Sequence, residues 1–257
     1  MNRNKNKPAA ETWPLKAYKN QAFLSSPDAR IVRVLAEFVE PESRLRREHV
    51  RNTIVFFGSA RAPSVASMAR NPREKRLVRY YRDAAELARK LSVWSLTIPD
   101  QRRQFYVCSG GGPGIMEAAN RGAAEAGAKS VGFNISLPFE QVPNAFQTKD
   151  LSFQFHYFFI RKFWFFYLAK AMAVFPGGMG TFDEFFELLT LVQTRKTVKY
   201  MPIVLYGSEF WREAVNFDAL VKWGTIDKED LKLFRIVDGV DEAFVYLREE
   251  LTKHYLG

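Results

Sequence analysis

A short apolar run leads directly into a glycine-rich turn, and a stretch with helical periodicity follows it. Residues 171–175 form an apolar run that is too short for a buried helix but suits a buried strand. The turn Pro176–Thr181 holds three glycines, and apolar residues then recur at helical spacing from Phe182 to Val192. A strand, a glycine turn and a helix in this order direct unpaired backbone N–H groups toward an anion. This segment therefore constrains both the fold and the kind of ligand.

The same order of strand, small-residue turn and helix occurs at two earlier places. One apolar run ends in Gly58-Ser59-Ala60, and another ends in Ser109–Gly114. The predicted strands span 53–57, 105–108, 130–135, 171–175, 202–206 and 234–237, and the predicted helices span 28–39, 72–91, 115–126, 157–170, 182–192, 210–223 and 241 onward. This alternation predicts an α/β fold, a Rossmann-like doubly wound parallel sheet with helices on both faces. The three small-residue turns then lie at one edge of the sheet, because they follow the carboxyl ends of parallel strands.

Length and composition favour a single domain with an N-terminal helical extension. The chain has 257 residues, 47% of them hydrophobic, which suffices for one sizeable α/β core, and no Pro/Gly/Ser-rich linker divides it. We expect residues 1–50 to form the extension, loose up to about residue 25 and then helical until Pro41 ends the helix. We expect residues 51–257 to form one Rossmann-like domain.

Charge and cysteine content narrow the function classes. A net charge of +10 suits an anionic ligand or partner, and the densest basic stretch, 70–89, is either a solvated helix face or a functional patch. The single Cys108 excludes a disulfide within one chain, and three scattered histidines offer no spacing for a metal site. We find no signal-peptide pattern and no apolar run of membrane-spanning length, so we expect a soluble cytoplasmic protein without metal.

The turn that follows the run 171–175 is the strongest candidate for a phosphate site. Gly177, Gly178 and Gly180 place no Cβ at the edge of the sheet, and Thr181 adds a hydroxyl donor. The loop Ser109–Gly114 is weaker evidence. It has neither the register of a dinucleotide-binding loop nor a Walker ending, and its glycines can serve the turn alone.

Two carboxylates follow the phosphate-type turn. Asp183 and Glu184 are about 100° apart on a helix, so one can face a ligand while the other turns to solvent. The best cation to balance the inward carboxylate is Arg161, with Lys162 beside it, on an aromatic helix where an unpaired arginine is costly. From the residues alone, the alternative that both cations extend from a buried face into solvent stays open.

Together these motifs resemble the Lonely Guy (LOG) family, whose members are often labelled lysine decarboxylase-like. The resemblance rests on Ser109–Glu117, on Arg161-Lys162 and on Pro176–Glu184, and it extends over roughly residues 50–225. An Arg-Lys pair followed by P-G-G-x-G-T-x-x-E is highly specific for the family. The resemblance implies a phosphoribohydrolase, which hydrolyses the N-glycosidic bond of a nucleoside 5′-monophosphate (AMP or a cytokinin riboside monophosphate). The products would be free base and ribose 5-phosphate, and no metal or redox cofactor is required.

The resemblance also implies roles for single residues. Arg161 and Glu184 would form the catalytic pair, with Arg161 keeping Glu184 ionised. Glu117 would help to bind the ribose or the base. The other substrate-binding residues expected from the turns and the family match are Gly58, Ser59, Gly111, Gly112, Lys162, Gly177, Gly178, Gly180 and Thr181. Family members are usually homodimers or larger homo-oligomers with the active site near the interface, and the aromatic helix at 157–167 is the candidate contact.

Other functions compete with this interpretation. Molybdenum cofactor carrier proteins share the fold and a similar glycine-threonine loop, and they would bind a phosphorylated ligand without cleaving it. The Arg161 and Glu184 pair favours the enzyme. A nucleic-acid-binding module would use the net charge, but no single-strand platform or helix-turn-helix pattern occurs. Lysine decarboxylation would need pyridoxal phosphate on a lysine that no local feature singles out, so we reject that activity. The sequence does not identify the base that the substrate carries, and residues 139–146 are the candidates for the base pocket.

Overall fold

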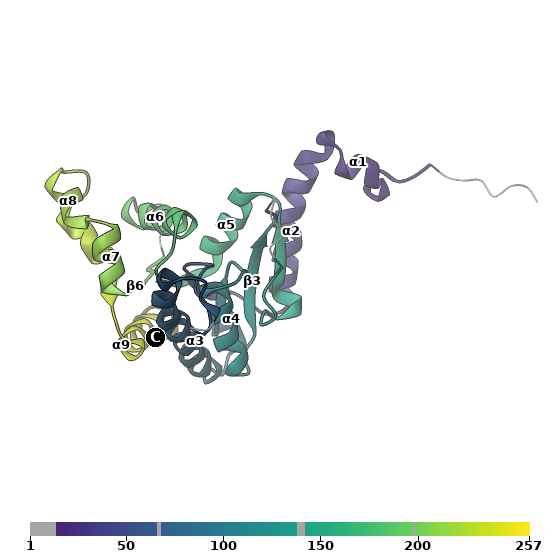
Figure 1. The fold of residues 1–257 in the computed structure, drawn as a ribbon. Helices are drawn as coiled ribbons and strands as arrows, with labels where there is room; N and C mark the ends of the chain where they lie inside the picture. Colours follow the sequence, from purple (N-terminus) through teal and green to yellow (C-terminus); the bar gives the residue numbers. More distant parts are fainter. Residues whose placement is uncertain (1–13, 66–67, 138–141, 198) are drawn as a thin grey trace, which may run out of the picture.

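The computed structural model describes residues 14–65, 68–137, 142–197 and 199–257 (Figure 1). Residues 1–13 of the predicted loose start and residues 139–141 of the predicted base pocket lie outside the described residues. In the described part, seven strands form one sheet in the order β4-β3-β2-β1-β5-β6-β7, and every neighbouring pair is parallel. The strands are β1 (Asn52–Phe57), β2 (Phe105–Ser109), β3 (Ser130–Ile135), β4 (Ser152–Phe155), β5 (Ala169–Val174), β6 (Ile203–Tyr206) and β7 (Arg235–Val237). The predicted doubly wound parallel sheet is thus confirmed.

Helices cover both faces of this sheet, and each face has its own apolar core. The α-helices of the described residues are α1 (Gln21–Ser25), α2 (Arg30–Arg47), α3 (Pro72–Leu96), α4 (Ile115–Glu125), α5 (Phe158–Leu168), α6 (Met179–Gln193), α7 (Ser208–Ala214), α8 (Phe217–Lys222) and α9 (Val240–Leu251). Buried side chains of α3, α4 and α9 pack on one face, and those of α5, α6 and α7, together with the C-terminal half of α2, pack on the other. Figure 1 shows α3, α4 and α9 on one side of the body, with α1 and the start of α2 projecting from it.

Pro41 does not end the N-terminal helix, as the sequence had predicted, because α2 continues through it to Arg47. A proline inside a helix leaves the carbonyl four residues earlier without its usual N–H donor. Here that carbonyl belongs to Glu37, and it accepts a hydrogen bond from the Trp164 indole Nε1 of α5 at 3.0 Å. A tertiary contact therefore replaces the missing bond, and the helix persists.

Three further differences concern short elements. Strand β4 was not predicted, because four residues at the edge of a sheet carry too little pattern to identify a strand. Residues 210–223, predicted as one helix, form α7 and α8, since Val215 is extended and the Asn216 side chain caps α8 by accepting from Ala219 N at 2.9 Å. The predicted helix at 157–170 ends at Leu168, and Lys170 already belongs to β5.

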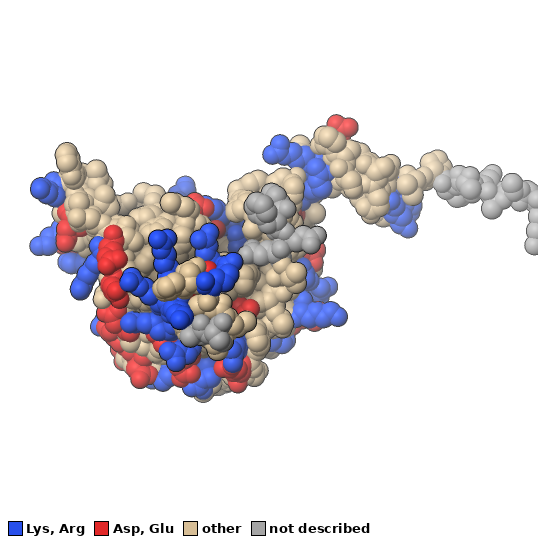
Figure 2. All heavy atoms as spheres, viewed as in Figure 1, with Lys and Arg blue, Asp and Glu red and all other residues tan. Residues whose placement is uncertain are grey.

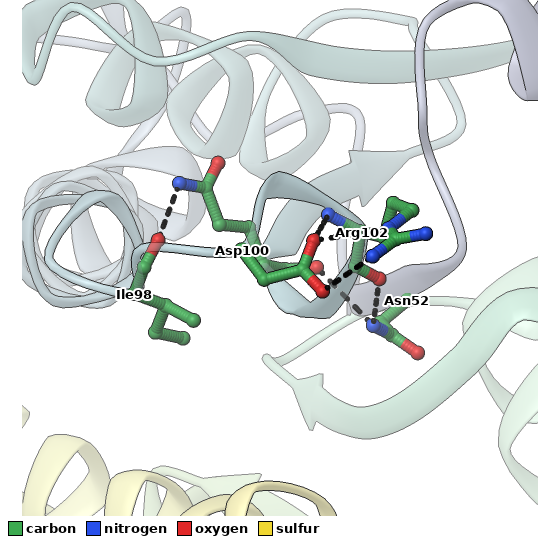
Figure 3. A network of polar contacts seen from close by, with 5 residues as sticks. Asn52, Ile98, Asp100 and Arg102 are labelled. Atoms are coloured by element: carbon green, nitrogen blue, oxygen red, sulfur yellow. Dashed lines mark hydrogen bonds and ion pairs between the residues drawn. The ribbon is translucent and has the colours of Figure 1, made fainter.

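The edge at which the strands begin is closed by polar contacts (Figure 3). The Asn52 side chain at the start of β1 donates to the Arg102 carbonyl at 3.2 Å, in the turn that precedes β2. Asp100 accepts from the Arg102 backbone N–H at 3.0 Å and from its guanidinium at 3.1 Å. Because the strands are parallel, this network lies at the opposite edge of the sheet from the glycine turns.

Candidate functional site

A cavity of about 730 Å³ lies at the carboxyl edge of the sheet, between the ends of β1 and β5 and the helices α5 and α6. This volume is within the range of small-molecule sites. Of the residues predicted to form the site, those lining the cavity are Gly58, Ser59, Arg161, Gly177, Gly178, Gly180, Thr181 and Glu184. The fold thus brings together eight residues from three separate parts of the chain.

Backbone hydrogen bonds tie the turns after β1, β2 and β5 to one another. Ser59 N donates to the Pro176 carbonyl at 2.9 Å, and Ile115 N donates to the Ser59 carbonyl at 3.0 Å. A Cβ on Gly58 would lie 2.7 Å from Ile115, and one on Gly114 would lie 2.2 Å from the Ser59 carbonyl oxygen. These two glycines are explained by the close contact between the turns rather than by a ligand.

The glycines at the start of α6 fall into two kinds. A Cβ on Gly177 would lie 2.1 Å from the Thr181 hydroxyl oxygen, whereas a Cβ on Gly178 or Gly180 would meet no atom of the described part of the chain within 4 Å. Neither Gly178 nor Gly180 has a positive φ angle. Packing and backbone conformation therefore do not require glycine at these two positions. The open space beside them can admit a ligand.

Helix α6 begins at Met179, earlier than predicted, so neither carboxylate lies in its first turn. Gly178 is the N-cap residue and supplies no side-chain cap. The first N–H groups of the helix thus keep their positive partial charge unopposed by a neighbouring acid, which suits an anion.

Glu184 is the inward-facing carboxylate, as expected for one of the two acids. The residue is 5% exposed, and its buried Oε2 atom has no hydrogen-bond partner among the described residues. Burial raises the pKa of Glu184 to about 7, although the charges of Arg161 and Lys162 lower it. Desolvation therefore outweighs the attraction of the two cations, although Arg161 acts in the expected direction by favouring the ionised form. Its role in keeping Glu184 ionised stays a prediction.

Arg161 reaches the cavity from α5. Its Nε donates to the Phe133 carbonyl of β3 at 2.7 Å, and its guanidinium lies 5.1 Å from the centre of the Phe165 ring. Burial lowers the pKa of Arg161, and the charge of Glu184 partly offsets this effect. Gly110 makes room for the guanidinium, since a Cβ there would lie 2.5 Å from Arg161 Nη2.

Lys162 does not line the cavity with Arg161. Its ammonium group lies 2.8 Å from the Asp183 carboxylate and 2.6 Å from that of Glu187, and these two ion pairs join α5 to α6. The side chain of Asp183 is 55% exposed. Lys162 and Asp183 thus form a bridge between the two helices that carry Arg161 and Glu184.

Three predicted residues, two in the loop after β2 and one in the first turn of α4, do not line the cavity. The carbonyls of Gly111 and Gly112 each accept from the Asn144 side chain at 3.0 Å. Glu117 accepts from the Tyr81 hydroxyl at 2.7 Å, and burial together with this carboxylate raises the pKa of Tyr81 to about 12. The geometry therefore gives these three residues structural contacts, and their role toward a ligand remains a prediction.

Several cavity residues were not predicted. They are Arg61, Leu77, Gly110, Met116, Ile135, Leu137, Phe158 and Phe210, among others. Arg61 directly follows the small-residue turn Gly58-Ser59-Ala60, and this position could have marked it. The apolar residues carry no such signal, because side chains of α3, α4, α5 and α7 converge there only in the folded chain.

The family comparison covers this same region. The model of the family described as "Possible lysine decarboxylase" matches residues 116–247, which is more than half of the chain. The chain belongs to this family. The matched part contains Arg161, the glycine turn at 176–181 and Glu184, and the family-level expectation is thus confirmed.

Three solved structures are similar to this chain to different degrees. The X-ray structure of TM1055 is similar with a TM-score of 0.51 at 21% identity, over 77% of this chain and 99% of that one. The Moco carrier protein from Chlamydomonas reinhardtii has a TM-score of 0.49 at 18% identity and covers 79% of this chain and 99% of its own. The molybdenum cofactor binding protein from the phototrophic bacterium Rippkaea orientalis has 0.48 at 14%, over 77% and 96%. The likeness to TM1055 shows the fold alone. No curated protein matches the sequence significantly.

The described residues lack two kinds of feature. We find no helix there with the length and apolar character that crossing a membrane requires. The same residues hold no group of three or more His, Cys, Asp and Glu side chains arranged to bind a metal ion.

Proposed function

We propose that this protein is a nucleoside 5′-monophosphate phosphoribohydrolase, which cleaves the N-glycosidic bond and releases free base and ribose 5-phosphate. The observation that carries the proposal is the buried Oε2 of Glu184 in the wall of the cavity, which none of the described residues pairs by a hydrogen bond. Leaving a buried carboxylate oxygen without a partner costs free energy, so such a group is expected where a ligand or a reacting water completes it.

The phosphate has a suitable site next to this carboxylate. The N-terminus of α6 has no side-chain cap on its first N–H groups, and the open space beside Gly178 and Gly180 lets an anion approach the backbone closely. Thr181, in the first turn, contributes a hydroxyl group to the same wall. A phosphate bound there places the attached ribose deeper in the cavity, toward Glu184.

Glu184 supplies the chemistry that the glycosidic bond needs. Cleavage passes through an oxocarbenium-like state, which a nearby carboxylate stabilises while it orients or deprotonates the attacking water. A pKa of about 7 lets the group exchange a proton at neutral pH. Arg161, held by the Phe133 carbonyl, keeps a fixed positive charge close to the carboxylate and favours its ionised form.

Decarboxylation of lysine fits this cavity less well. That chemistry normally uses pyridoxal phosphate joined to a lysine. The cavity walls described in the structure contain arginines but no lysine, and Lys162 is engaged by Asp183 and Glu187. The family description is therefore not the activity that we propose for this chain.

We propose in addition that the protein works as a homodimer or a larger homo-oligomer through α5. Exposed aromatic side chains line this helix: Phe158 is 50%, Phe159 56%, Phe163 41% and Tyr167 54% exposed. Phe158 also lines the cavity, so a second copy packed on α5 would lie beside the site. Light scattering of wild type and Phe159→Glu tests this proposal, with loss of the oligomer expected in the variant.

The activity test uses AMP, GMP, CMP, UMP and isopentenyladenosine monophosphate, with free base and ribose 5-phosphate as the measured products. We expect at least one nucleotide to be cleaved and Glu184→Gln to lower kcat about 100-fold or more. Glu187→Gln, one turn further along α6, is the matched control and should keep its activity. If none of the five nucleotides yields base while AMP still binds, the protein is a non-catalytic binder of phosphorylated ligands, such as a molybdenum cofactor carrier.

A further inference from the structure

Arg61 stands at the mouth of the cavity on a backbone that is fixed to the phosphate-type turn. Its N–H donates to the Ser59 hydroxyl oxygen at 3.0 Å, and Ser59 N in turn donates to the Pro176 carbonyl at 2.9 Å. Arg61 is exposed and lines the same cavity as Gly178 and Thr181. Its guanidinium therefore starts from an anchored position beside the N-terminus of α6.

No carboxylate of the described residues forms an ion pair with Arg61. The hydrogen bonds from Arg70 and, to a smaller extent, the charge of Arg61 lower the pKa of Glu74, and the side chain of Glu74 is already engaged by Arg70. Glu74 accepts from the Arg70 backbone N–H at 2.8 Å and from its Nε at 3.1 Å, and Arg70 Nη2 lies 3.0 Å away. Arg161, the other arginine of the cavity wall, donates to the Phe133 carbonyl. Arg61 is thus the exposed cation that this wall offers to a ligand.

Further cations surround this mouth. A basic segment on the N-terminal half of α3 carries exposed side chains that form no ion pair within the described part of the chain: Arg73, Lys75, Arg76, Arg79 and Arg82. Leu77, in the same segment, lines the cavity, so the segment borders the opening. Figure 2 shows Lys and Arg side chains gathered over α3 in the centre of the view. This arrangement creates a positive potential at the entrance.

We propose that Arg61 binds the phosphate group of the ligand together with the N-terminus of α6, and that the basic segment of α3 speeds its capture. A guanidinium forms strong, charge-assisted hydrogen bonds to phosphate oxygens. Unpaired charges around an entrance raise the association rate of an oppositely charged ligand, and salt screens this effect. This inference rests on the proposed function in one respect, the choice of a sugar phosphate as the ligand. Binding of the phosphate by Arg61 does not depend on whether a bond is then cleaved.

The test measures binding of ribose 5-phosphate, which cannot be hydrolysed at a glycosidic bond, by calorimetry and stopped-flow at several salt concentrations. We expect Arg61→Gln to weaken its Kd about tenfold or more and to leave the Kd of unphosphorylated adenosine unchanged. The double variant Arg73→Gln/Arg76→Gln should lower the association rate and its salt dependence, with the dissociation rate nearly unchanged. Arg102→Gln is the control, since it removes the same charge at the opposite edge of the sheet (Figure 3).

The outcomes separate this inference from the hydrolase proposal. If Arg61→Gln binds ribose 5-phosphate as wild type does, or if Arg102→Gln lowers the association rate as much as the double variant on α3, the inference is overturned. A protein that cleaves no nucleotide but binds ribose 5-phosphate through Arg61 would refute the hydrolase and uphold the inference. If the protein cleaves nucleotides but Arg61→Gln leaves its affinity for ribose 5-phosphate unchanged, the hydrolase proposal is supported and the inference is refuted.

Discussion

The guanidinium of Arg161 lies where a side chain on Gly110 would have to be. A Cβ built on Gly110 would lie 2.5 Å from Arg161 Nη2 and 2.6 Å from the sulfur of Met116. Gly110 directly follows β2 and Arg161 belongs to α5, so a glycine 51 residues earlier in the chain permits the position of the cation. This contact links the glycine loop after β2 to the candidate catalytic pair, although Gly111 and Gly112 of that loop do not line the cavity.

Gly110→Ala should therefore impair activity more than folding. The atoms that a new Cβ would meet are the Nη2 of Arg161 and the sulfur of Met116, which belong to side chains and not to the backbone, so a small shift of these atoms can relieve the overlap. This shift moves the guanidinium whose charge acts on Glu184, so we expect kcat to fall about tenfold or more while the melting temperature changes little. Gly111→Ala is the contrasting variant. Its φ is +72° and its Cβ would lie 2.1 Å from the Asn134 side-chain oxygen, so there the melting temperature should fall.

The raised pKa of Glu184 predicts a specific dependence of stability on pH. The unfolded chain releases this proton near pH 4.5, whereas the folded protein holds it up to about pH 7. Stability linked to Glu184 is therefore full below pH 4.5, declines as the pH rises toward 7, and stays low above it. The total loss is at most about 3 kcal/mol, from 1.36 kcal/mol per pKa unit.

Glu184→Gln removes this titration, so the stability of the variant relative to wild type should increase between pH 4.5 and 7. Urea unfolding of both proteins at a series of pH values measures the difference. Glu187→Gln, which alters a half-exposed carboxylate on the same helix, is the control for general effects of charge. A stability difference that does not change with pH would show that Glu184 has an ordinary pKa in the folded protein.

Gly178 and Gly177 should respond differently to alanine. Gly178→Ala meets open space, so we expect an unchanged melting temperature but weaker binding of ribose 5-phosphate, because the methyl group occupies room beside the N-terminus of α6. Gly177→Ala would place its Cβ 2.1 Å from the Thr181 hydroxyl oxygen and should lower the melting temperature. Thermal unfolding and calorimetry of the two variants check this contrast. Unaltered phosphate binding by Gly178→Ala would speak against an anion at this position.

The bond between Trp164 and Glu37 can be tested by a double-mutant cycle with Pro41. Trp164→Phe leaves the Glu37 carbonyl without a partner, which we expect to cost about 1–3 kcal/mol of unfolding free energy in addition to lost packing. In a Pro41→Ala background, the new backbone N–H of residue 41 can donate to that carbonyl as in a regular helix. Trp164→Phe should then cost less. Equal losses in both backgrounds, measured by urea unfolding, would contradict the replacement of one bond by the other.

Periodicity predicted the positions of the longer strands and helices well, because a buried strand and an amphipathic helix leave different repeats in the sequence. The apolar runs at 53–57 and 130–135 correspond to β1 and β3 within one residue. Elements whose formation depends on a distant partner escaped this reasoning. Strand β4 exists because β3 pairs with it, and α2 continues past Pro41 because Trp164 reaches the Glu37 carbonyl.

The candidate site divides in the same way. The glycine turn, the Arg-Lys pair and the two acids could be located from their residue types and spacing. The sequence did not reveal that Lys162 turns to Asp183 or that Glu117 turns to Tyr81, because neighbouring residues on a helix face different directions and only packing decides which direction is buried. Arg61 was missed for a related reason. Its position beside the glycine turn depends on the backbone hydrogen bond between Ser59 and Pro176.

The sequence by itself determined the class of fold, the edge of the sheet that carries the small-residue turns, and the family to which the chain belongs. These properties follow from local repeats and from a short motif, and both involve residues that are close together in the sequence. Only the tertiary structure decided which glycines serve packing and which leave space for a ligand, and that Glu184 keeps its proton up to about pH 7. Such properties depend on burial and on atoms brought together from distant segments, because desolvation and close contact exist only once the chain has folded.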